Sequence, residues 1–120
     1  MLRFRSLASG SSGNATLIEA HDGLHPTRVL IDCGLGLRQL QAALAADGLS
    51  PTDLDGVFIT HEHGDHIGCV AMLAARYRVP IWTSAGTAQS LKLPHDADAP
   101  VHHVGDGQVF SIRGLEFRPF

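Results

Sequence analysis

The sequence predicts an α+β fold: a mixed β-sheet with helices packed on one face. In the middle of the chain, short apolar runs typical of buried strands alternate with segments whose apolar residues recur at helical spacing. At both ends, strand-like segments follow one another around glycine-containing turns, as in antiparallel hairpins. The chain has 120 residues, which predicts a single domain over residues 1–120.

Local patterns justify each element. Side chains alternate over residues 2–7, and the glycines within residues 9–13 permit the turn that leads into the second strand. Gly48 predicts the end of the first helix, and Pro51 and Asp53 indicate the loop that follows it. We expect strands at residues 2–7, 14–20, 27–32, 57–60, 81–83, 108–113 and 115–120, and helices at residues 37–47, 67–77 and 87–93.

Composition argues against several classes of protein. The net charge is −3 and no run of Lys or Arg is present, which disfavours a protein that coats nucleic acid with a basic surface. A metal ion could still supply the positive charge that a phosphate substrate requires. No apolar stretch has the length of a transmembrane helix, and residues 1–7 lack the apolar region of a signal peptide. We therefore expect a cytoplasmic protein.

The two cysteines, Cys33 and Cys69, do not form a disulfide framework on sequence grounds. Both lie in apolar contexts, with leucine, isoleucine or valine close by in the chain. A free cysteine in such apolar surroundings is typically buried. We expect two buried free thiols.

Four potential metal ligands occupy six positions at residues 61–66, which read His-Glu-His-Gly-Asp-His. The first two histidines follow a predicted strand, where residues two apart point to the same side with Cα atoms about 6–7 Å apart. The glycine permits a sharp turn, and the aspartate and last histidine begin the next predicted helix. Ligand pairs on both sides of a turn suit two metal ions about 3.5–4 Å apart. The predicted ligands are His61, His63, Asp65 and His66.

The remaining histidines are not predicted to bind metal. His102 and His103 are adjacent, so their side chains would face opposite ways in a strand. His21, His25 and His95 lie in polar loops and are expected to be solvated. An isolated histidine is more often a surface or core residue, whereas four ligand types between a buried strand and an amphipathic helix favour metal binding.

Residues 60–68, Thr-His-Glu-His-Gly-Asp-His-Ile-Gly, resemble the signature of the metallo-β-lactamase superfamily. Residues 6–14, Ser-Leu-Ala-Ser-Gly-Ser-Ser-Gly-Asn, and residues 30–34, Leu-Ile-Asp-Cys-Gly, resemble its bacterial WalJ/YycJ-like branch, which is related to the phosphodiesterase PhnP. The resemblance covers nearly the whole chain. It implies the N-terminal half of a four-layer αββα sandwich, truncated at the C-terminus.

The resemblance also implies roles for individual residues. The His-x-His pair would bind one metal ion, and the aspartate and last histidine the other, with Asp65 orienting the nucleophile. Asp32 would support the metal loop without binding metal, although the residues alone equally allow a helix cap or a turn. Asn14 and the Ser-Gly turn would lie near the site, where successive backbone N–H groups can hold an anion. A plain connecting turn is the alternative.

The family pattern continues with a third histidine, a bridging aspartate and a final histidine, all expected beyond residue 120. Each metal ion would therefore keep only two protein ligands within this chain. The ions are two divalent metals, with zinc favoured by the imidazoles and manganese or iron as alternatives.

The activity implied is metal-dependent hydrolysis of phosphodiesters, by a nuclease or phosphodiesterase acting on DNA, RNA or a small phosphodiester. A thioesterase or lactamase-type hydrolase shares the motif and remains an alternative. A different alternative is a catalytically inactive metal-binding fragment. Its inner sheet face would be exposed and could mediate a homo-oligomer.

Overall fold

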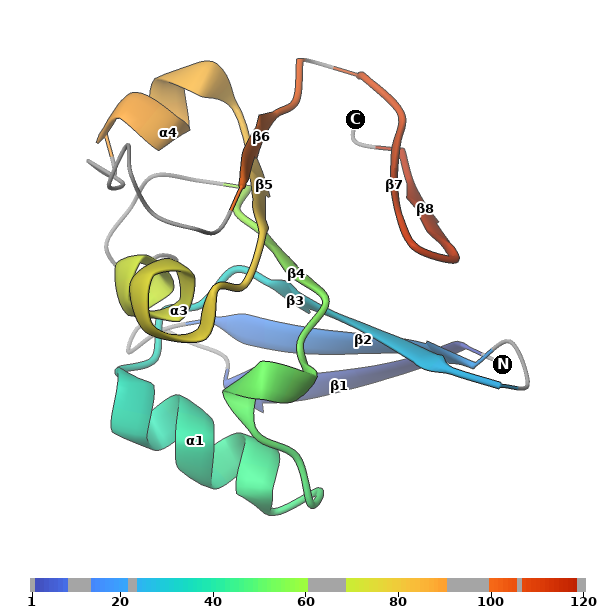
Figure 1. Ribbon diagram of the computed structural model, residues 1–120, viewed down its shortest axis with the longest axis vertical. Coiled ribbons are helices and arrows are strands. Elements are labelled where there is room, and N and C mark those ends of the chain that lie inside the picture. The colour runs from blue at the N-terminus through green and yellow to red at the C-terminus, as the bar shows by residue number, and fades with distance from the viewer. Residues whose placement is uncertain are drawn as a thin grey trace.

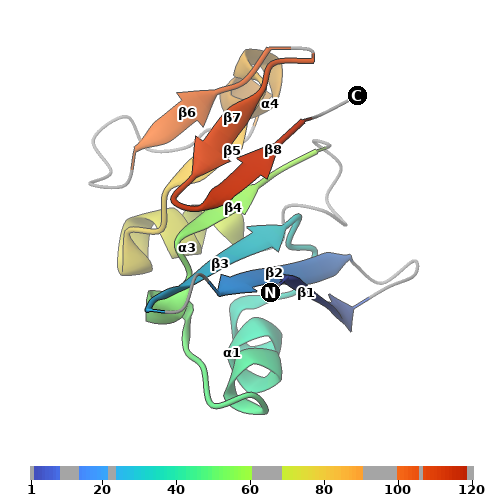
Figure 2. The same ribbon diagram turned by 90° about the vertical axis from the view of Figure 1, so that its right-hand side faces the viewer.

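A six-stranded mixed sheet runs through the molecule (Figures 1 and 2). The computed structural model describes residues 2–8, 14–21, 24–60, 69–90, 100–105 and 107–118. Within them the strands of this sheet follow their order in the sequence. The strands are β1 (Leu2–Ala8), β2 (Ala15–His21), β3 (Pro26–Ile31), β4 (Gly56–Phe58), β5 (Ile81–Thr83) and β6 (Val101–His103).

Strand direction changes across the sheet. β1, β2 and β3 pair antiparallel, whereas β3, β4, β5 and β6 pair parallel. Parallel neighbours need a crossover connection, usually a helix. Here α1 (Leu37–Ala45) and the short 3₁₀ helix η1 (Pro51–Asp53) connect β3 to β4, α3 (Val70–Tyr77) precedes β5, and α4 (Ala85–Ser90) follows it. In the described part of the chain, no helix is long and apolar enough to span a membrane.

The predicted class, a mixed sheet with helices, is confirmed, and the differences lie at element ends. The helix predicted at residues 87–93 already begins at Ala85, because the Ser84 hydroxyl accepts a hydrogen bond from the Thr87 N–H at 3.1 Å and caps its first turn. Its predicted end lies outside the described residues. The segment expected to be a loop contains η1, and His102 and His103, expected in a strand or a loop, lie in β6.

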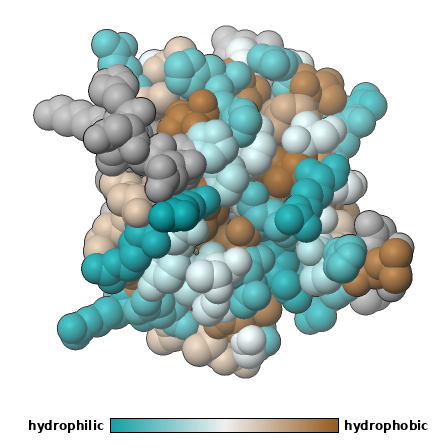
Figure 3. All heavy atoms as spheres, in the orientation of Figure 1, coloured by the Kyte–Doolittle hydropathy of each residue, from teal (hydrophilic) through white to brown (hydrophobic). Residues whose placement is uncertain are grey.

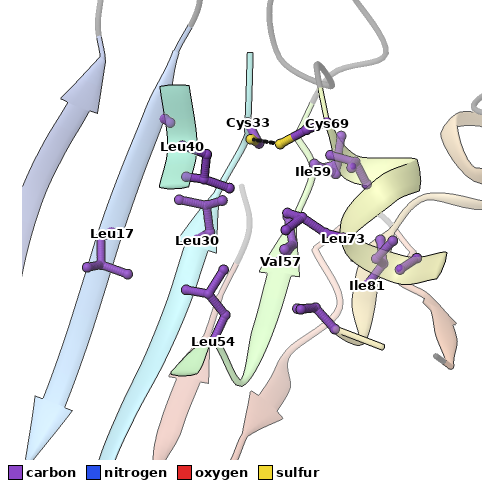
Figure 4. Packing of buried hydrophobic residues seen from close by; sticks show 14 of the residues in the cluster. Leu17, Leu30, Cys33, Leu40, Leu54, Val57, Ile59, Cys69, Leu73 and Ile81 are labelled. Carbon is purple, nitrogen blue, oxygen red and sulfur yellow. Dashed lines mark hydrogen bonds between the residues drawn. The ribbon is translucent and has the colours of Figure 1, made fainter. Parts of the chain in front are cut away.

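One face of the sheet carries an apolar row that spans four strands. Its members are partners in register from β2 to β5, and each is at most 2% exposed. Leu40 of α1 and Leu73 of α3 belong to the same buried cluster and cover the row (Figure 4). Burial of this apolar surface is the main force that holds the helices on this face. The row consists of Leu17, Leu30, Val57 and Ile81.

A hairpin lies on the other side of the sheet, away from α1 and α3 (Figures 1 and 2). Its strands, β7 (Phe110–Ile112) and β8 (Leu115–Phe117), are antiparallel, as predicted, and shorter than predicted. A Cβ at Gly56 would lie 2.5 Å from Cζ3 of Trp82 and 3.3 Å from Cδ1 of Ile112. The hairpin and sheet therefore approach this closely because position 56 has no side chain.

Aromatic rings fill the space between hairpin and sheet. Phe58, Trp82 and His102 are register partners on β4, β5 and β6. The ring centroid of Phe58 lies 5.1 Å from that of Phe110 and 6.1 Å from that of Phe117, both edge to face. Such contacts add to the stabilisation from burial alone. The sheet thus has helices on one face and an aromatic contact with the hairpin on the other.

Candidate metal centre

The predicted metal ligands lie outside the described residues. His61, His63, Asp65 and His66 all fall within residues 61–68, whereas the structure describes both borders of that segment. Among the described residues, no three His, Cys, Asp or Glu side chains lie close enough together to hold a metal ion. Contacts from other segments position the two borders of residues 61–68, Thr60 and Cys69.

Asp32 holds the residue that directly precedes the motif. Its carboxylate accepts hydrogen bonds from the Thr60 N–H at 2.8 Å and the Thr60 hydroxyl at 2.7 Å. Asp32 is 7% exposed and has a φ of 58°, a left-handed conformation that aspartate tolerates better than most residues. Its own N–H donates to the Phe58 carbonyl at 2.8 Å. The end of β3 and the exit from β4 are therefore joined by three bonds to one residue.

The alternative interpretation of Asp32 as a helix cap does not describe its contacts. The N-cap position of α1 is Gly36, and the Asp32 carboxylate bonds to Thr60 on the neighbouring chain segment instead. Asp32 lies in the connection that follows β3, with its carboxylate bonded across to Thr60. Its support of a metal loop stays a prediction.

β5, which pairs with β4 on the side away from β3, also bonds the chain where it leaves β4. The fully buried hydroxyl of Thr83 donates to the Ile59 carbonyl at 3.1 Å, and the Ile59 N–H donates to the Trp82 carbonyl at 3.0 Å. A buried hydroxyl that makes such a bond fixes the backbone it contacts. The chain that enters the motif is thus held by β3 on one side and β5 on the other. Sequence reasoning missed Thr83, because 24 residues separate it from Ile59.

Cys69, which directly follows residues 61–68, contacts the residue after Asp32. The Sγ atoms of Cys33 and Cys69 lie 3.0 Å apart (Figure 4). Both thiols are free and buried, as predicted, although their contact was not foreseen. The hydrogen bond from Cys69 lowers the pKa of Cys33, and the same bond together with burial raises the pKa of Cys69. Asp32 and Cys33, which follow β3, therefore contact the two borders of residues 61–68.

Asn14 lies beside the connection that follows β3. Its backbone carbonyl accepts a hydrogen bond from the Gly34 N–H at 2.7 Å. The Ser-Gly turn at residues 9–13 lies outside the described residues, so the predicted anion-binding role of this region stays a prediction.

The other histidines contribute no cluster to the described part of the chain. His102 stacks on Trp82 with ring centroids 4.4 Å apart, and its neighbour His103 is exposed. His21 and His25 are also exposed, and His95 lies outside the described residues. Adjacent strand residues face opposite sides of a sheet, so the two β6 histidines do not converge.

Comparison with known proteins places these features in a family. The family model described as the metallo-beta-lactamase superfamily matches residues 8–119. The exodeoxyribonuclease WalJ of Streptococcus pneumoniae is 37% identical over 90 residues, which cover 75% of this chain and 32% of WalJ. The exodeoxyribonuclease YycJ of Bacillus anthracis is 32% identical over 114 residues, which cover 91% of this chain and 41% of YycJ.

Another relative has a different activity. A hydroxyacylglutathione hydrolase of Rhodopseudomonas palustris is 36% identical over 83 residues, which cover 66% of this chain and 28% of that protein. The chain thus spans less than half the length of each of these curated relatives.

The fold comparison agrees with the family match. A metallo-beta-lactamase of Cronobacter sakazakii matches 89% of this chain, and 47% of its own, with a TM-score of 0.69 and 21% identity. At that identity the match establishes the fold alone. The family and fold predicted from the motif are confirmed, and this chain belongs to the metallo-beta-lactamase superfamily.

Proposed function

We propose that this chain is part of a metal-dependent phosphodiesterase that degrades nucleic acid, with DNA as its substrate. Membership of the superfamily makes the protein a hydrolase, and the fold implies divalent metal ions. The phosphodiester substrate is supported by the similarity to two exodeoxyribonucleases, one of which matches 91% of this chain. The hydroxyacylglutathione hydrolase matches 66%, so thioester hydrolysis is the second candidate.

The donor set of the motif fits the proposed metals. His61, His63, Asp65 and His66 offer three imidazoles and a carboxylate, donors that zinc accepts and that manganese or iron also accept. Bound ions of this kind polarise a phosphoryl oxygen and make a bound water nucleophilic at neutral pH. We assign Asp65 the orientation of that nucleophile. Further ligands are expected beyond residue 120.

The observation that carries the proposal is the fixation of both borders of residues 61–68. Thr60 is bonded to buried Asp32, and Cys69 contacts Cys33, so both borders meet consecutive residues of one turn. Metal ligands act only when held within about 0.5 Å of their productive geometry, which requires rigid support around them. We therefore infer that Asp32 is a positioning residue and that the turn it occupies supports the metal ligands.

Substrate assays on the full-length product of the gene test this proposal. The protein, loaded with zinc or manganese, is assayed with bis(p-nitrophenyl) phosphate and end-labelled DNA, and in parallel with nitrocefin and a hydroxyacylglutathione thioester. We expect both phosphodiesters to be hydrolysed. Turnover of nitrocefin or the thioester alone would show that the phosphodiester assignment is wrong.

A pair of variants ties the activity to the motif. Asp65→Asn is expected to lower the rate at least about 100-fold, as loss of a residue that orients the nucleophile does. His103→Ala removes an exposed imidazole outside the motif and should leave the rate unchanged. If Asp65→Asn and His103→Ala lowered the rate equally, the activity would not depend specifically on residues 61–66.

Residues 1–120 alone are expected to be inactive and to bind zinc weakly. Each ion would keep two protein ligands, whereas zinc sites use three or four. Calorimetric titration of this segment with zinc measures the affinity. Submicromolar binding of two ions would contradict the expectation and indicate that the site is completed within this chain or by a second copy.

A further inference from the structure

Cys33 and Cys69 form a buried dithiol that the proposed hydrolysis does not use. Their Sγ atoms lie 3.0 Å apart, and the two residues are 0% and 3% exposed. That distance is about 1 Å longer than the roughly 2.05 Å of a disulfide bond. A small side-chain adjustment would therefore bring the two sulfurs to bonding distance. They are also the chain's only two cysteines.

The pair occupies a defined place beside the motif. Cys33 follows Asp32 at the end of β3, and Cys69 directly precedes α3 and follows residues 61–68. On the other border, Thr60 is held to Asp32 by two hydrogen bonds. A covalent bond between the sulfurs would add a covalent but reducible link at the second border, where the present contact is non-covalent.

We propose that Cys33 and Cys69 are a redox modification site, at which a peroxide converts the two thiols into a reversible intramolecular disulfide. The Cys33 thiolate attacks one oxygen of hydrogen peroxide, the O–O bond breaks, and Cys33 becomes a sulfenic acid while hydroxide leaves and is protonated to water. The Cys69 sulfur then attacks the Cys33 sulfur, the S–O bond breaks, and a second water leaves with the Cys69 proton. Two thiols and one peroxide thus give one disulfide and two waters.

The surroundings of the pair determine which sulfur reacts first. The thiolate is the reactive form of cysteine. The hydrogen bond between the two thiols lowers the pKa of Cys33, whereas the same bond together with burial raises the pKa of Cys69. Cys33 is therefore the residue that attacks the oxidant, and Cys69 resolves the sulfenic acid. Because both thiols are buried, the oxidant must be a small molecule such as hydrogen peroxide.

Peptide mapping tests the proposal without any assay of activity. The folded full-length protein is treated with equimolar hydrogen peroxide, residual thiols are blocked with iodoacetamide, and the protein is digested with trypsin without reduction. Cleavage after Arg28, Arg38 and Arg76 places the two cysteines in separate peptides, residues 29–38 and 39–76. We expect these two peptides to be recovered as one linked species, with loss of both free forms, and dithiothreitol to restore them.

Two serine variants provide the matched controls. Cys33→Ser and Cys69→Ser each leave one thiol of the pair, and neither should yield a linked species of these two peptides. Recovery of both thiols unmodified from folded wild-type protein would overturn the proposal, as would their conversion to sulfinic acid or cross-links between chains. The wild-type map decides the outcome even if a variant fails to fold. The result is also independent of the proposed phosphodiesterase activity.

Discussion

The antiparallel and the parallel parts of the six-stranded sheet are built in different ways. β1 and β2 are seven residues each and pair along nearly their whole length, whereas β4 and β5 have three residues each. The long ribbon is positioned by its ladder of backbone hydrogen bonds. The short parallel strands are positioned in addition by buried polar side chains, Asp32 and Thr83, that bond the chain leaving β4.

The antiparallel strands carry exposed apolar side chains and ion pairs. Phe4 and Leu2 on β1 are 67% and 51% exposed, and ion pairs such as Arg28 with Glu19, at 2.7 Å, lie across β2 and β3. On the face seen in Figure 3, hydrophobic residues are scattered among hydrophilic ones. The comparison teaches that backbone pairing suffices where the chain only forms a sheet. Where the chain leaves the short strand β4 toward residues 61–68, buried side chains fix its exit.

Asp32→Ala should have the largest effect on this comparison. It removes the two hydrogen bonds that the buried Asp32 carboxylate accepts from Thr60, and we expect the free energy of unfolding to fall by about 3 kcal/mol. Zinc affinity of the full-length protein should fall about 10–100-fold, as for other groups that orient metal ligands. Urea unfolding and calorimetric zinc titration measure these two effects.

Asp32→Asn is the matched control for that change. The amide oxygen can still accept a hydrogen bond from the Thr60 N–H, so this variant should retain more stability than Asp32→Ala. If neither substitution altered unfolding or zinc affinity, the exit of β4 would not depend on Asp32, and the contrast between the two regions would fail.

Gly56→Ala should have the next largest effect. The new Cβ would lie 2.5 Å from Trp82 Cζ3, and relief of that clash should cost about 1–3 kcal/mol of stability. Gly86→Ala in α4 is the control, because a Cβ at position 86 would meet nothing within 4 Å and alanine favours a helix by about 1 kcal/mol. Thermal unfolding should shift in opposite directions for the two variants. A shift in the same direction would contradict the close packing of Trp82 and Ile112 against Gly56.

Thr83→Val should have a smaller effect of about 1 kcal/mol, because it removes one hydrogen bond from the Ile59 carbonyl while keeping the size of the side chain. Chemical denaturation measures the change. Thr83→Ser keeps the hydroxyl, so zinc affinity should be retained by the serine variant and reduced in the valine variant. Equal zinc affinities would limit Thr83 to a role in packing.

Arg5→Ala in the long ribbon should have the smallest effect. Arg5 pairs with Asp47 of the chain after α1, and both side chains are partly exposed, 46% and 29%. Exposed pairs of this kind contribute about 0.5 kcal/mol or less, and salt screens them. Denaturant midpoints at low and high salt should therefore nearly coincide for wild type and variant. If Arg5→Ala lowered the free energy of unfolding as much as Asp32→Ala, side chains would matter equally in the antiparallel and the parallel regions.

Much of the fold was predictable because its signals are local. The alternation of apolar runs and helical spacing predicted the central strands and helices, and the glycine-centred turn predicted the β7–β8 hairpin. The short helix η1 was missed, because Pro51 and Asp53 were interpreted as signals of a loop. The start of α4 was misplaced because a serine cap outweighed the apolar pattern.

By itself, the sequence determined the donor types of the motif and the family, because residues 60–68 are contiguous and their chemistry can be read without a fold. Only the tertiary structure decided which residues hold the borders of that segment. Asp32 and Thr60 are 28 positions apart, and Cys33 and Cys69 are 36 apart. The parallel register of β3 with β4 brings the first pair together, and the return of the chain into α3 brings the second. Contacts of this kind depend on strand register and helix packing, which no local pattern specifies.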